Sequence, residues 1–236
     1  MSTTMMKMME TTALALAASL CALQGQAQEA KTLYPTMAPF EQYLMERNSE
    51  IALARTAAPP AISGDAKILF LAPKGYQTAV EGKNGFVCLV ERGWMSGADA
   101  PEFWNPKIRG PICFNPPAAR SILPITYFRT QLVIAGKSEA QIMEACKEAF
   151  ASKELPGLEP GAMSYMMSKA AYLTDHGDHK LAHVMFYTPE MVGEVWGADV
   201  SNSPIMLGNQ FTSGEPVSTF IVAVPEWSDG TAAPLM

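Results

Sequence analysis

The stretch KILFLAPKGYQTAVEGKNGFVCLVER, residues 67–92, decides the fold class. Its apolar segments 67–71 and 86–91 are typical of short β-strands bounded by Pro and Gly. Between residues 76–81 and 86–91 lies an Asn-Gly pair, Asn84 and Gly85, which suits the positive φ angles of a tight turn. The stretch therefore predicts a hairpin at that pair and a three-stranded antiparallel meander from Lys67 to Arg92.

Helical patterns flank this β region on both sides. Before it, a broken apolar stripe predicts a helix over 39–57, which Ala58-Pro59-Pro60 ends because proline cannot continue the hydrogen-bond ladder. After it, the pattern predicts three helices, over 126–135, 139–152 and 161–173. Ser138 and Gln141 form a capping-box pattern at the start of the second of these helices. For the first, Leu132-Val133-Ile134 leaves a strand as an alternative.

Two later segments, 183–187 and 217–224, have the short apolar pattern of strands. Strands and helices do not alternate regularly along the chain, which argues against a doubly wound parallel sheet. The sequence therefore predicts an α+β fold, a mainly antiparallel sheet with helices packed on one face.

The segment 93–124 is rich in Trp, Pro and Gly, and it predicts a long ordered loop. Loops of that length are uncommon in compact domains unless they serve a function. The simpler interpretation is an aromatic cover over the sheet. The functional alternative is the wall of a ligand pocket, with Trp94, Trp104, Arg109 and Asn115 as its contacts.

The first 27 residues have the pattern of a signal peptide. Lys7 precedes the apolar run 13–23, which is too short to span a bilayer, and Ala27 offers a small residue at the cleavage site. We therefore expect an exported protein, periplasmic or secreted, whose mature part, residues 28–236, is a single α+β domain. No later segment has the length of a transmembrane helix, so we expect no integral membrane segment after processing.

The charge balance excludes one class of partner. The net charge is −6 with only 17 Lys and Arg, and this lacks the basic footprint of a nucleic-acid-binding protein. A small-molecule or protein partner remains, and the sequence does not identify it.

Three cysteines follow the leader: Cys88, Cys113 and Cys146. An oxidising compartment permits one disulfide, and Cys88 with Cys113 is the preferred pair because both lie in or near strand and loop segments. A pair of reduced, buried thiols is the alternative that the sequence leaves open. Cys146 lies on the apolar face of a predicted helix, where it behaves as a small hydrophobic residue.

All three histidines lie in one short segment, at His176, His179 and His183, beside Asp175 and Asp178. Imidazole and carboxylate groups are suitable ligands for zinc and related divalent metals. The simplest interpretation is a solvated connection between a helix and a strand. Metal binding by these five residues is the first alternative, and a metal-free acid–base role is the second.

Two functional hypotheses follow from these patterns. The first is an exported binding or structural protein. The second is a divalent-metal-dependent, hydrolase-like enzyme that uses the histidine cluster. The sequence supplies neither a named general base nor a known catalytic motif, so the first hypothesis is favoured and enzymatic activity stays undecided.

Overall fold

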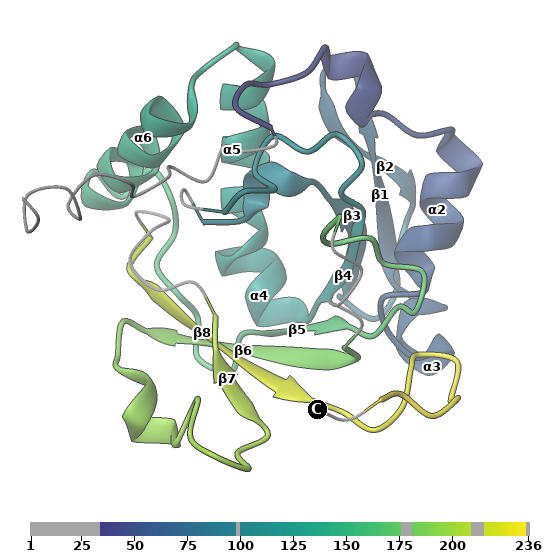
Figure 1. Ribbon diagram of the computed structural model, residues 1–236. Coiled ribbons are helices and arrows are strands. Elements are labelled where there is room, and N and C mark those ends of the chain that lie inside the picture. The colour runs from purple at the N-terminus through teal and green to yellow at the C-terminus, as the bar shows by residue number, and fades with distance from the viewer. Residues whose placement is uncertain (1–33, 98–99, 176–180, 209–214, 235–236) are drawn as a thin grey trace, which may run out of the picture. The chain divides into compact units, whose positions relative to one another are not determined.

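The computed structural model describes residues 34–97, 100–175, 181–208 and 215–234 (Figure 1). The predicted signal peptide, residues 1–27, lies outside these ranges. The elements, in chain order, are η2 (Phe40–Tyr43), α2 (Arg47–Arg55), α3 (Pro60–Ser63), β1 (Lys67–Ala72), β2 (Gly75–Val80), β3 (Val87–Glu91), η3 (Gly93–Met95), β4 (Gly110–Phe114), α4 (Pro116–Ser121), α5 (Leu123–Ile134), α6 (Glu139–Ala151), β5 (Met163–Met166), β6 (His183–Pro189), η4 (Gly193–Trp196), β7 (Ile205–Leu207) and β8 (Val217–Ala223). Among the described helices, none is long and apolar enough to cross a membrane.

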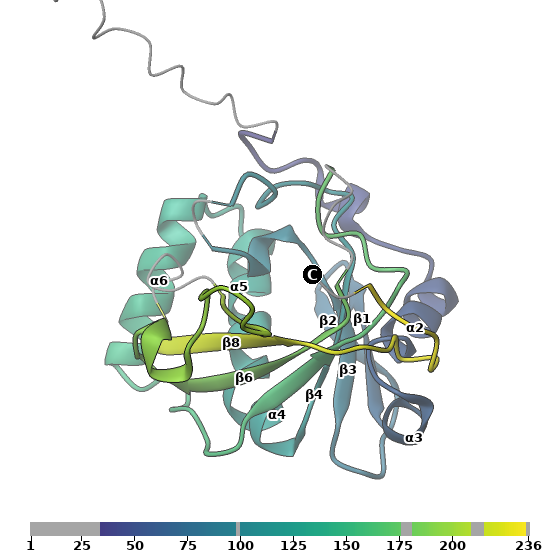
Figure 2. The same cartoon turned by 60° about the horizontal axis from the view of Figure 1, so that its bottom comes forward.

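The strands form one eight-stranded sheet in the order β2-β1-β3-β4-β5-β6-β8-β7. Every neighbouring pair is antiparallel except β1 and β3, which run parallel. The prediction of an α+β fold with a mainly antiparallel sheet is therefore confirmed. Figure 2 shows the long strands β6 and β8 side by side, continuing the sheet that begins with β1 to β4.

Helices flank the sheet from both sides (Figure 1). On one face, α4 and α5 cover the apolar side chains Leu89, Ile112 and Phe114, and α6 packs behind α5. On the other face, α2 packs against β1, β3 and β4 through Ala54, which belongs to the same cluster as Ile68. The alternation of Ile68 and Leu69, or of Cys113 and Phe114, explains why this part of the sheet needs cover on both faces.

The predicted hairpin at Asn84-Gly85 is wrong. The hairpin forms earlier in the chain, between β1 and β2, where Ala72 pairs with Gly75. The backbone of Gly75 has a φ of +110°, which glycine adopts without a steric penalty. Strand β2 occupies one edge of β1, and β3 pairs with the other edge. Gly85 does take a positive φ, but Asn84 donates to the Ile62 carbonyl (2.7 Å) instead of closing a β2–β3 turn.

Other segments also differ from the sequence-based prediction. The expected helix over 161–173 is strand β5 followed by irregular backbone, because Met163–Met166 pairs on both edges, with β4 and β6. The expected loop over 93–124 contains β4, α4 and the start of α5. The expected helix over 39–57 is divided, since the Glu46 side chain accepts from the Asn48 and Ser49 amides and starts α2 there.

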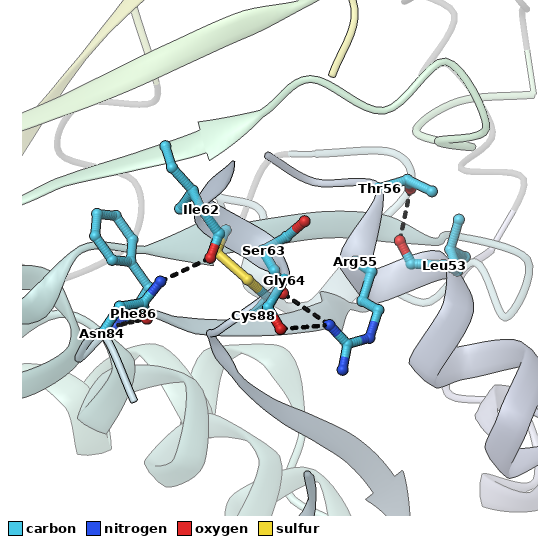
Figure 3. Close-up of a disulfide and its surroundings, with 10 residues drawn as sticks. Leu53, Arg55, Thr56, Ile62, Ser63, Gly64, Asn84, Phe86 and Cys88 are labelled. Atoms are coloured by element: carbon cyan, nitrogen blue, oxygen red, sulfur yellow. Dashed lines mark hydrogen bonds between the residues drawn. A yellow bond between two sulfur atoms is a disulfide. The ribbon is translucent and has the colours of Figure 1, made fainter. Parts of the chain in front are cut away.

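A disulfide joins Cys88 and Cys113 at paired positions of β3 and β4. Both cysteines are fully buried beneath the segment that connects α2 to β1. Figure 3 shows how polar side chains fix that segment: Arg55 donates to the carbonyls of Ser63 (2.9 Å) and Gly64 (3.1 Å), and Asn84 donates to Ile62. Cys146, in contrast, is a buried free thiol on α6.

Candidate functional site

A cavity lies against the sheet face that α4 and α5 cover. The strand register places its floor, because residues that pair directly point to the same face. Met166 of β5 pairs with His183 of β6, and Met185 pairs with Ile221 of β8. Glu91, the last residue of β3, pairs with Gly110 on this same face. Five strands, β3 to β6 and β8, therefore meet at the cavity and bring apolar side chains together with the carboxyl group of Glu91.

The cavity has two adjoining lobes that share Glu91 and the three methionines Met95, Met166 and Met185. The lobe called inner here, which is also lined by Ile122 and Ile125, has a volume of about 210 Å³. The outer lobe has a volume of about 330 Å³ and extends towards polar residues. The additional residues of the outer lobe include Glu102, Ile108, Thr174 and His183.

Gly110 is part of the reason that this space exists. A Cβ atom built at Gly110 would lie 3.2 Å from both the Met166 Cε and the Leu173 Cδ2 atoms. Glycine therefore lets the methionine side chain lie over β4. Methionine thioethers are flexible and polarizable, so walls built from them adapt to ligands of different shape.

Glu91 is the distinctive polar group of the cavity. Its Oε1 atom accepts a long hydrogen bond from the Thr126 hydroxyl (3.4 Å). Burial among apolar walls disfavours the charged form and raises the pKa of the Glu91 carboxyl to about 7, while Thr126 and Arg129 act in the opposite direction. The group therefore changes charge near neutral pH.

The second acid of the inner lobe, Glu215, lies beside a buried cation. The Arg129 Nε and Glu215 Oε1 atoms are 3.0 Å apart, and the arginine side chain is fully buried. Its Nη1 atom also donates to the Trp94 and Ser96 carbonyls, at 3.0 Å each. Arg129 thus serves to hold the residues around η3 and to neutralise Glu215.

Of the five residues in the predicted histidine cluster, the structure describes two, Asp175 and His183. His183 is 4% exposed, and its Nδ1 atom lies 2.9 Å from the Leu181 carbonyl oxygen. Asp175 accepts hydrogen bonds from the Tyr172 and Tyr34 hydroxyls and from Lys107, and these contacts hold the pKa of its carboxyl well below the usual range. This aspartate fastens residue 34 to the 172–175 segment.

The other members of that prediction, His176, Asp178 and His179, lie outside the described residues. Within the ranges that are described, no group of three or more His, Cys, Asp and Glu side chains is arranged to hold a metal ion. Zinc binding by the cluster therefore remains a prediction from the sequence.

The four residues expected to form a ligand pocket do not converge on the cavity. Trp94 is fully buried against Tyr43, and its Nε1 donates to the Thr130 hydroxyl (3.2 Å). Trp104 is 5% exposed in the same cluster. The polar pair binds backbone, since Arg109 donates to the carbonyls of residues 106 and 108, and Asn115 accepts from the amides of residues 118 and 163.

The sequence did contain signals for the cavity, although they are weak. Glu91 ends a run of apolar residues, 86–90, which is an unusual place for an acid that points into a protein interior. Met166 and Met185 become neighbours only through strand pairing, so no spacing along the chain indicates them. Comparison of the chain with models of protein families, with curated proteins and with solved structures finds no match.

Proposed function

We propose that this protein is an exported binding protein that takes a small, mainly apolar ligand into the cavity beside β3 to β8. The observation that carries the proposal is the cavity itself, with methionine and isoleucine walls around the carboxyl group of Glu91, which both lobes share. Concave apolar sites with a few convergent polar groups are the usual form of small-molecule sites.

Binding is tested by filling the cavity from β8. Ile221 points into both lobes, whereas its neighbour Val222 points to the opposite face of the same strand. The larger indole should occupy space that the ligand needs. We therefore expect Ile221→Trp to weaken binding of the neutral fluorescent probe N-phenyl-1-naphthylamine by about tenfold or more, which corresponds to about 1.4 kcal/mol. The measurement is a fluorescence titration of the mature protein.

Val222→Trp is the matched control, because it adds the same side chain to the same strand outside the cavity. Equal probe affinity for wild type and Ile221→Trp, with both folded by circular dichroism, contradicts the proposal. So does failure of the wild type to bind the probe.

Export is supported by the leader pattern of residues 1–27 and by the disulfide, since disulfides are rare in reducing compartments.

A protein recovered from the exported fraction should begin at Gln28 and thus lack Cys21. After denaturation it should take up one maleimide at Cys146 without reductant and two more at Cys88 and Cys113 after reduction. Mass spectrometry measures both features, and an intact leader or an uptake of three labels without reductant contradicts this prediction.

A further inference from the structure

The acids and cations around the cavity do not balance. Arg129 lies beside Glu215, and Arg92, which lines the outer lobe, is paired with Glu50 (2.9 Å). Among the described residues, Glu91 takes part in no ion pair, and its one hydrogen bond within the protein is the long contact from Thr126. Within the described ranges, the carboxyl group of Glu91 thus faces the cavity without an ion-pair partner, although Arg129 lies near enough to lower its pKa.

An ionised carboxylate in such a place is costly unless a positive charge accompanies it. Arg92 and Arg129 are engaged with other acids, so a bound molecule can supply the missing charge. A protonated amine forms a short, charge-assisted hydrogen bond with a carboxylate. An anionic ligand, in contrast, would meet the Glu91 and Glu102 carboxylates, while Glu215 is paired with Arg129.

We infer that the ligand has an apolar body, which contacts the methionines and isoleucines, and one cationic amine, which pairs with the Glu91 carboxylate. This inference rests on the proposed binding function, whose site it shares. The methionine walls accept aryl or alkyl bodies of different shape, so the charge at Glu91 determines the ligand class.

The charge also fixes the direction of the pH dependence. A bound amine favours the ionised form of Glu91, so binding releases a proton when the carboxyl was protonated beforehand. Amine affinity should therefore rise as pH increases through about 7. A neutral ligand that accepts a hydrogen bond from the protonated carboxyl should show the opposite trend.

Other titratable groups face the same space and must be separated from Glu91. Arg129 and Glu215 lie near it on the inner side, together with Tyr187, whose pKa burial raises above its usual value. His183 and Glu102 lie in the outer lobe. Because histidine also titrates near neutral pH, only a change of Glu91 itself assigns the pH dependence.

The experiment compares 4-phenylbutylamine with 4-phenylbutanol, in which a neutral hydroxyl replaces the cationic amine. Both are titrated calorimetrically into the mature protein at about pH 5.5 and about pH 8.5. At the higher pH we expect the amine to bind about tenfold tighter than the alcohol, and its affinity to fall at the lower pH. Glu91→Gln should remove both differences. Glu81→Gln, which removes the same charge from an exposed strand end, should keep them.

The inference is overturned if the alcohol binds as tightly as the amine, or if the amine binds Glu91→Gln as it binds wild type. Either result leaves the proposed binding function standing, because the compound then occupies the cavity without a contribution from the charge of Glu91. If neither compound nor the neutral fluorescent probe binds, the proposed function fails, and the inference fails with it.

Discussion

Replacing Arg92 by methionine is expected to lower the free energy of unfolding by about 3–5 kcal/mol. Arg92 and Glu50 form an ion pair in which both side chains are completely inaccessible to solvent. The guanidinium also donates to the carbonyls of Tyr43 (2.7 Å) and Val90, and the same Glu50 oxygen accepts from the Leu71 amide (3.1 Å). Removing the cation leaves a buried carboxylate without its charge partner.

The loss should be large because the pair connects elements that are distant in sequence. Glu50 belongs to α2, Leu71 to β1, and Arg92 follows β3 directly. Among the described residues, the Glu50 Oε2 atom is already buried without a hydrogen-bond partner, so loss of Arg92 leaves the carboxylate with the Leu71 amide as its donor. Methionine keeps much of the volume of arginine, and the measured effect then reports the charge more than a cavity.

Urea denaturation at neutral pH measures the change, and Arg120→Met is its control. Arg120 also pairs with a glutamate, Glu159 (2.7 Å), but at the surface, where its side chain is 60% exposed. Exposed pairs contribute at most about 1 kcal/mol, so this variant should unfold close to wild type. Equal losses for the two variants would contradict a special role for the buried pair.

The parts of the fold that local chemistry determines could be predicted from the sequence. The helix α6 starts where Ser138 and Gln141 complete the expected capping box, and β6 and β8 lie at their expected positions. In these segments the backbone follows the hydrogen bonds and apolar pattern of the segment itself. Tertiary pairing does not have to override them.

Long-range pairing decided the segments that were predicted wrongly. The methionine-rich segment 161–173 has helical spacing, yet β5 fills the position between β4 and β6 and so becomes a strand. The Asn84-Gly85 pair has the chemistry of a hairpin turn, yet β1 inserts between the two strands that it was expected to join. Such competition depends on partners that no local pattern reveals.

The candidate site was missed for a related reason. A cluster of histidines indicates a candidate site directly, because imidazole binds metals and titrates near neutral pH. Glu91, in contrast, resembles any other glutamate in the sequence. Its unusual surroundings arise only when η3, β5 and β6 place Met95, Met166 and Met185 around it. The functional signal is therefore the environment of the residue, and this becomes visible only once the strand register is known.

That environment predicts an unusual pH dependence of stability. The pKa of Glu91 rises from 4.5 to about 7 on folding, so between these values the folded protein holds a proton that the unfolded chain has lost. Stability from this group is then fully present below about pH 4.5 and is lost as the pH rises through about 7. A shift of this size corresponds to a loss of up to about 3 kcal/mol.

Glu91→Gln removes this contribution, because the amide has nearly the same shape and does not ionise. Without ligand, the free energy of unfolding of wild type minus that of Glu91→Gln should therefore fall between about pH 4.5 and about pH 8, whereas the difference for Glu81→Gln should stay nearly flat. Urea denaturation across this range measures both differences. Parallel curves for wild type and Glu91→Gln would mean that the carboxylate is already stabilised in the folded protein, by water or by a paired cation, and the reason for a cationic ligand at Glu91 would then be lost.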